Sequence, residues 1–148
     1  MRDYTDESIP DDVARRILDA GRLAGSSRNL QKWEFVVVSD RDELAEAVFA
    51  PENVRTAALA VAIAGEAAPF DVGRAAENML LAAWNEGVGS CPNGIRDAEA
   101  AERIVGAPVR MILSFGYPAR TRDVGSRSAE DWSVRAKRRP FDDVVRFV

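Results

Sequence analysis

The segment from Asp71 to Glu86 constrains the fold most, because it predicts a long helix that is apolar on most of its faces. A helix of this kind is buried on most sides or lies in a subunit interface. Gly87 and Gly89 follow the segment and are expected to end the helix. We therefore expect a central helix, with a second copy of the chain as the simplest cover for its remaining apolar surface. The apolar residues of the segment are Ala75, Met79, Leu80, Leu81, Ala82, Ala83 and Trp84.

Three further helices are predicted from capping residues and apolar spacing. The first is expected to begin with Ser8 as N-cap and Pro10 in its first turn, and its apolar residues recur at spacings of three and four. Asp40 is typical of the N-cap of a second helix that runs to about Phe49. A third, short helix is predicted from Asp97 to about Ile104.

Three segments rich in β-branched and apolar residues predict strands. They are residues 33–39, 57–64 and 109–115. The second is a continuous apolar run, which is typical of a strand buried on both faces. Residues 25–29 predict a loop, and residues 91–94 predict a turn. Together these elements predict an α+β domain.

The C-terminal part of the chain is expected to differ from the rest. Residues 119–135 are polar and lack a helical or strand period, so we predict a linker there. Residues 136–148 are predicted to form a C-terminal arm whose apolar residues need a surface to pack against. With these two segments, residues 1–148 are expected to form one domain, which suits the length of the chain.

Composition excludes several kinds of chemistry. The sequence has no histidine, which rules out Ser-His-Asp and Cys-His catalysis and imidazole metal sites. Cys91 is the single cysteine, so neither an intrachain disulfide nor a cysteine-based metal cluster can form. We therefore expect no metal site and no catalytic side chain, and we expect any chemistry to be carried by a bound cofactor.

Charge and hydropathy bear on partners and location. The formal net charge of −4 argues against non-specific binding of nucleic acid. The longest apolar run, residues 57–64, is shorter than the ~20 residues that cross a bilayer. The first residues carry no apolar segment of the kind found in secretory signals. These features predict a cytoplasmic protein that binds neither membrane nor nucleic acid.

Several segments of the chain together resemble the nitroreductase family of flavoproteins. Residues 24–35 (AGSSRNLQKWEF) are similar to the family pattern Ala-Pro-Ser-Ser-x-Asn-x-Gln-Pro-Trp-x-Phe, with Gly25 and Lys32 in place of the usual prolines. Residues 2–5 followed by Ile9-Pro10 resemble the end of the family's opening pattern. Residues 78–89 resemble its central dimer helix, and residues 138–145 resemble its C-terminal phosphate arm.

The resemblance implies a nitroreductase-like fold, with a central, mostly antiparallel sheet flanked by helices in an intertwined homodimer. It implies one FMN at each of two symmetric subunit interfaces. Such enzymes take two electrons from NADH or NADPH and reduce nitro compounds, quinones or similar small-molecule acceptors, usually in a ping-pong cycle. The side chains would then contribute positioning and electrostatics rather than acid or base catalysis.

The resemblance also implies which residues contact the flavin. Arg2, Arg138 and Arg139 match positions that hold the FMN phosphate, a group that suits arginine well, although Lys137 is an alternative within the arm. The backbone and side chains of the 25–29 loop would contact the ring, and backbone N–H groups of the 92–94 segment would lie near its N5 and O4 atoms. Asn53 would reach the pyrimidine edge. The expected cofactor-binding residues are Arg2, Gly25, Ser26, Ser27, Asn29, Asn53, Pro92, Asn93, Gly94, Arg138 and Arg139.

Two departures from the family pattern leave other functions open. The Arg-Ser pair that relatives have before the position of Arg2 is missing, and the stretch of residues 65–70 is too short for the helical lid found in relatives. An open site and weak FMN binding follow as expectations. The alternatives are a non-catalytic member of the fold that serves as a binding or regulatory module, and a flavin enzyme with another reaction, such as azoline oxidation, dehalogenation or flavin fragmentation.

Overall fold

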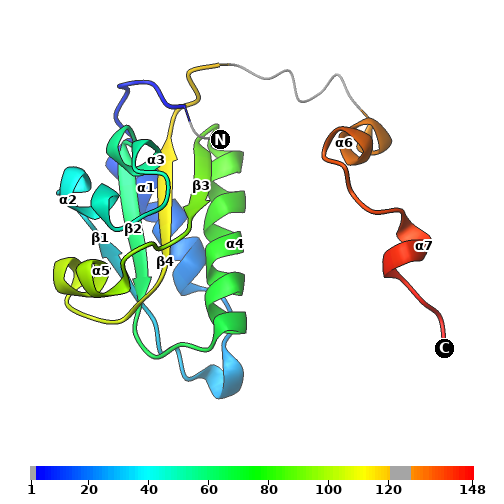
Figure 1. The fold of residues 1–148 in the computed structure, drawn as a ribbon, viewed down its shortest axis with the longest axis horizontal. Coiled ribbons are helices and arrows are strands. Elements are labelled where there is room, and N and C mark those ends of the chain that lie inside the picture. Colours follow the sequence, from blue (N-terminus) through cyan, green and yellow to red (C-terminus); the bar gives the residue numbers. More distant parts are fainter. Residues whose placement is uncertain (1–2, 121–127) are drawn as a thin grey trace.

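The computed structural model describes residues 3–120 and 128–148, and its centre is a four-stranded antiparallel sheet. The strand order is β1-β2-β4-β3, so β2 and β4 lie inside and the other two form the edges (Figure 1). The bounds are β1 (Glu34–Val37), β2 (Leu59–Ala64), β3 (Gly89–Asn93) and β4 (Val109–Gly116). All six residues of β2 are buried, as the continuous apolar run predicts.

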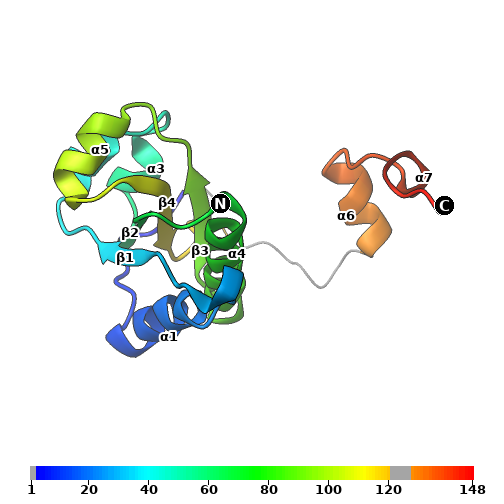
Figure 2. The same ribbon diagram turned by 90° about the horizontal axis from the view of Figure 1, so that it is seen from below.

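Helices cover both faces of the sheet (Figures 1 and 2). On one face, α1 (Asp11–Arg22) packs against α4 (Pro69–Asn85), and Ile17, Met79 and Phe115 belong to the core between these helices and the sheet. On the other face lie α2 (Arg41–Glu46), α3 (Glu52–Arg55) and α5 (Ala98–Val105), with a second core. The predicted α+β architecture, with an antiparallel sheet flanked by helices, is confirmed.

The central helix α4 is buried on one side only. Its buried side includes Ala75, Met79 and Ala83, which pack against the sheet and α1. Leu81 and Trp84 remain 59% and 51% exposed. Large apolar side chains that are half exposed on one helix mark a surface suited to a partner.

Helix capping follows the sequence in some places and not in others. Asp40 caps α2, because its carboxylate accepts a hydrogen bond from the Glu43 backbone N–H at 2.9 Å, although α2 ends at Glu46 rather than near Phe49. Asp97 caps α5 in the same way. Ser8 does not cap α1, because the helix begins at Asp11 and Pro10 occupies the N-cap position.

The turn predicted at residues 91–94 is wrong. Cys91, Pro92 and Asn93 lie in β3, which pairs with β4 in the register Pro92↔Leu113. Proline disfavours a central strand because it cannot donate a ladder hydrogen bond, but β3 is an edge strand and tolerates it. Pairing with β4 therefore outweighs the local turn signal.

The linker predicted at residues 119–135 contains helix α6 (Ala129–Arg135). A reciprocal capping box starts this helix, because the Ser128 and Asp131 side chains each accept a backbone hydrogen bond from the other residue. Helix α7 (Phe141–Val144) follows, and both helices stand apart from the sheet in Figure 1. Their large apolar side chains are exposed, with Phe141 at 63% and Phe147 at 87%.

Candidate functional site

The loop after α1 carries four of the residues predicted to bind a cofactor. We call residues 25–31 the 25–31 loop; it includes a 3₁₀ turn at Ser27–Asn29. Arg28, Asn29 and Gln31 have positive φ angles of 53°, 56° and 48°. Left-handed backbone costs on the order of 1–3 kcal/mol for a residue other than glycine, and strain of this kind clusters at ligand-binding sites. The loop is therefore held in an unfavourable conformation.

Hydrogen bonds inside the 25–31 loop maintain this conformation. The Ser26 hydroxyl oxygen accepts from the Gln31 backbone N–H at 2.9 Å, and the Asn29 N–H donates to the Ser26 carbonyl at 3.0 Å. Ser27 and Asn29 are exposed. In the described part of the chain, neither the Ser27 hydroxyl nor the Asn29 side-chain amide has a hydrogen-bond partner. Both groups are therefore available to a ligand.

Helix α4 supports the 25–31 loop from one side. The Ser27 backbone N–H donates to Asp71 Oδ2 at 3.1 Å, and Asp71 is only 7% exposed. The Arg74 guanidinium lies against Gly25 of the loop. A Cβ atom added at Gly25 would lie only 2.5 Å from Arg74 Nη2. Arg74 also lies over the exposed ring of Phe70, with 5.7 Å between Cζ and the ring centroid. Neither Asp71 nor Arg74 stands out in the sequence as a site residue. An acidic residue in a first helical turn is common, and no pattern marks Arg74.

Asn53 and Asn93 belong to a buried polar network rather than to an open surface. Asn53 Nδ2 donates to Asn93 Oδ1 at 3.2 Å, and the two side chains are 7% and 4% exposed. Asn93 Nδ2 in turn donates to the Ser114 hydroxyl at 3.1 Å and to the Cys91 carbonyl at 3.0 Å. These bonds join α3 to β3 and β4. Both amides are directed into the protein, and the exposed residues of the 92–94 segment are Pro92 and Gly94.

Tyr4 closes this network from the N-terminal segment. Its hydroxyl donates to the Ser114 carbonyl at 3.1 Å, and the ring packs so closely on Gly116 that a Cβ there would lie 2.7 Å from Tyr4 Cγ. Burial raises the pKa of Tyr4 to about 12, although the hydrogen bond with Ser114 opposes the shift. The network therefore holds a phenol that stays protonated well above the ordinary tyrosine pKa.

We expect stability to fall at alkaline pH because of Tyr4. Unfolded tyrosine loses its proton near pH 10, whereas the folded group keeps it to about pH 12. Between these values the unfolded state binds fewer protons, so the free energy of unfolding decreases as the pH rises. Phenolate absorbance can be titrated against pH in the wild type and in Tyr4→Phe. The difference between the two curves reports Tyr4 alone and should have a midpoint well above pH 10. A midpoint near 10 for Tyr4 would contradict the buried network.

The remaining predicted residues lie near the two ends of the chain. Arg2 is outside the described residues. Arg138 and Arg139 lie between α6 and α7 and are exposed. The Arg138 backbone N–H donates to the Ser133 carbonyl at 3.0 Å, and Arg139 Nη2 donates to the Asp143 carbonyl at 2.8 Å. The Arg138 guanidinium has no hydrogen bond or ion pair within the described residues.

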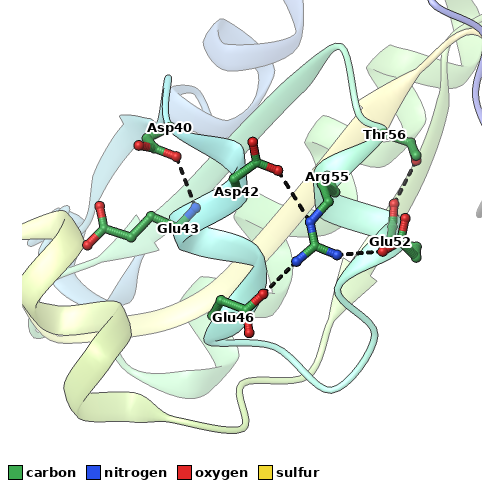
Figure 3. A network of polar contacts seen from close by, with 7 residues as sticks. All are labelled: Asp40, Asp42, Glu43, Glu46, Glu52, Arg55 and Thr56. Carbon is green, nitrogen blue, oxygen red and sulfur yellow. Dashed lines mark hydrogen bonds and ion pairs between the residues drawn. The ribbon is translucent and has the colours of Figure 1, made fainter.

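A cleft of about 440 Å³ lies elsewhere, between the N-terminal segment, the start of α2 and the end of α3. Its lining residues include Asp6, Arg41 and Arg55, and none of the predicted cofactor residues is among them. Arg55 forms ion pairs with Asp42, Glu46 and Glu52, which already surround its guanidinium (Figure 3). The cleft is therefore separate from the predicted cofactor site.

Among the residues that the structure describes, no helix is long and apolar enough to cross a membrane. Within the same residues, no group of three or more acidic or cysteine side chains is placed to hold a metal ion.

Comparisons with known proteins place the chain in a family. A sequence model of the nitroreductase family matches residues 1–66 and 53–117. A protein of Archaeoglobus fulgidus named "Putative NADH dehydrogenase/NAD(P)H nitroreductase" is 32% identical over 143 residues, which cover 83% of this chain and 82% of the relative.

Solved structures give the same result. A Desulfovibrio desulfuricans protein described as "a putative nitroreductase in complex with fmn" is 25% identical, with a TM-score of 0.76 over 89% of this chain and 88% of that one. An FMN-dependent nitroreductase from Clostridium difficile has the same fold, with a TM-score of 0.79 at 24% identity over 99% of this chain and 92% of that one. The four-stranded antiparallel sheet and its flanking helices thus define an α+β protein of the nitroreductase fold. The chain belongs to the nitroreductase family.

Proposed function

We propose that two copies of this chain bind FMN and act as an NAD(P)H-dependent oxidoreductase on nitro compounds, quinones or similar acceptors. The observation that carries the proposal is the exposed, strained 25–31 loop, which bears the family's Ser-Ser-x-Asn pattern with the Ser27 hydroxyl and the Asn29 amide unengaged. A family member of known structure, from Desulfovibrio desulfuricans, was solved in complex with FMN.

The donor set fits the chemistry of FMN. The isoalloxazine ring presents carbonyl oxygens and ring nitrogens, which the Ser27 hydroxyl and the Asn29 amide can hydrogen-bond. The phosphate is an anion, and Arg138 and Arg139, with Arg2, would supply the cations that hold it. FMN, when bound, would supply the two-electron chemistry of a ping-pong cycle between NADH or NADPH and the acceptor.

In this proposal the side chains bind and orient the reactants. Asn53 and Asn93 fix the position of the edge strand β3, so that Pro92 in the strand and Gly94 just after it are held in place. Of the two, only Gly94 has a backbone N–H to donate. Arg28 lies within the 25–31 loop and Arg74 beside it, and each cation would attract an anionic donor or acceptor. A site of this kind would raise the rate of electron transfer mainly by orienting the reactants and by the charges around them.

A homodimer is part of the proposal. Leu81 and Trp84 on α4 are half exposed, and the arm from α6 to the C-terminus exposes Val134, Phe141 and Phe147. Burying such side chains contributes roughly 25 cal/mol for each Å² of apolar surface removed from water. A second copy of the chain would cover these surfaces and complete each flavin site.

The visible spectrum of the purified protein tests the proposal. We expect a yellow protein, or one that turns yellow with added FMN, whose colour is bleached by NADH or NADPH and restored by a quinone. A colourless protein that does not bind FMN would contradict the proposal. Sedimentation at several concentrations should show a dimer, and a protein that stays monomeric would contradict the shared site.

A second candidate function is a non-catalytic flavin-binding or regulatory protein of the same fold. The observation that favours it is the connection between β2 and α4, which consists of residues 65–68 alone and leaves no room for a covering helix. Bleaching by dithionite but by neither NADH nor NADPH would support this candidate, or a flavin enzyme with another reaction, over the first.

A further inference from the structure

Asp71 is a buried carboxylate at the start of α4 that bonds outside its own helix. It lies at the third helical position, where an acidic side chain usually accepts a hydrogen bond from the start of the same helix. Instead, Oδ2 accepts from the Ser27 backbone N–H at 3.1 Å, across 44 positions of sequence.

The 25–31 loop depends on this bond more than an ordinary loop would. Three of its residues have positive φ angles, and none of the three is glycine. The other hydrogen bonds of the loop join its own residues. In the described chain, the bond from Ser27 to Asp71 is the one hydrogen bond between the loop and another element. A strained conformation persists only where its surroundings hold it.

We infer that Asp71 is a positioning residue for the flavin site. By holding the Ser27 N–H, its carboxylate fixes the strained turn in the conformation that presents the Ser27 hydroxyl and the Asn29 amide. Preorganisation of this kind raises affinity because the ligand does not have to order the loop. The inference rests on the proposed function only for the identity of the ligand, because the hold on the loop exists without it.

Two substitutions of Asp71 distinguish an effect of its hydrogen bond to Ser27 from an effect of side-chain packing. Asp71→Asn keeps the size of the side chain and one carbonyl oxygen that can accept from Ser27, whereas Asp71→Leu keeps the size and removes the acceptor. The matched control is Glu86→Gln at the C-cap of the same helix, because Glu86 pairs with Arg16 of α1 and not with the loop. Should Asp71→Leu fail to fold, Asp71→Ala serves in its place, because alanine is favourable in a helix.

The first measurement is amide hydrogen exchange at Ser27 in the protein without flavin. We expect protection in the wild type, in Asp71→Asn and in Glu86→Gln, and its loss in Asp71→Leu. The second is FMN affinity, measured by quenching of flavin fluorescence. We expect Asp71→Leu to bind FMN about tenfold more weakly, which corresponds to about 1.4 kcal/mol. Asp71→Asn and Glu86→Gln should stay within about threefold of the wild type.

The outcomes distinguish this inference from the proposed function. A wild type that does not bind FMN overturns the function, while the exchange measurement still tests the hold on the loop. A wild type that binds FMN with the same affinity as Asp71→Leu overturns the inference. Equal weakening in Asp71→Asn and Asp71→Leu would also overturn it, since the acceptor oxygen would then not be the cause.

Discussion

Replacing Phe115 with alanine is expected to lower the free energy of unfolding by about 3–5 kcal/mol, the range for large-to-small substitutions of buried aromatic residues. Phe115 is fully buried and is the largest such side chain among the described residues. It lies in β4, an interior strand, and faces the core formed with α1 and α4. Its loss would remove apolar contacts and leave a cavity that rigid strands on both sides cannot close.

Chemical denaturation at a fixed protein concentration would measure this effect. The midpoint should fall while the slope stays constant, because the surface exposed on unfolding hardly changes. Phe49→Ala is the matched control, since Phe49 is 72% exposed, and it should cost less than about 1 kcal/mol. A loss below about 1 kcal/mol for Phe115→Ala would contradict the burial of Phe115 in the core.

Replacing Arg138 and Arg139 together with alanine is expected to weaken FMN binding by about a hundredfold. A hydrogen bond to a charged group contributes about 1.5–3 kcal/mol, so the loss of two phosphate contacts gives an effect of this order. Both arginines are exposed and lie on one short segment between α6 and α7. The Arg138 guanidinium makes no hydrogen bond within the described residues, so its removal should cost the folded protein little.

Equilibrium binding of FMN, followed by fluorescence, would test this prediction. Arg146→Ala is the control, because it removes one arginine charge from the same arm at a position outside the predicted phosphate site. Adding salt should weaken the wild-type interaction more than that of the double variant, since exposed charges are screened. Unchanged flavin affinity in the double variant would show that other groups hold the phosphate.

Local signals in the sequence predicted most of the elements. The apolar run at residues 57–64 became β2, and the segment from Asp71 to Glu86 became α4 with bounds shifted by one or two residues. Asp40 acts as the predicted cap because an N-cap bond joins residues three positions apart and needs no distant partner. The residue pattern at 24–35 also predicted the family, which the comparisons confirm.

Features that depend on contacts between distant residues could not be predicted from local sequence patterns. Pro92 lies in β3 because this edge strand pairs with β4. No local sequence pattern predicts that pairing. The family resemblance predicts that Asn53 contacts the flavin, whereas in the structure its side-chain amide donates to Asn93 inside the protein. The sequence shows that the side chains of Asn53 and Asn93 are amides, but the packing of α3 against β3 decides the direction in which they point.

By itself, the sequence determined most of the helices and strands, the buried run that became β2 and the family pattern that the loop after α1 carries, but not β3 or α6. These properties follow from the spacing of neighbouring residues along the chain. Only the tertiary structure decided that Asp71 meets Ser27 and that Asn53 meets Asn93, because each pair is separated by about forty residues or more. Contacts of that range depend on how helices and strands pack, and packing is a property of the whole fold rather than of any one segment.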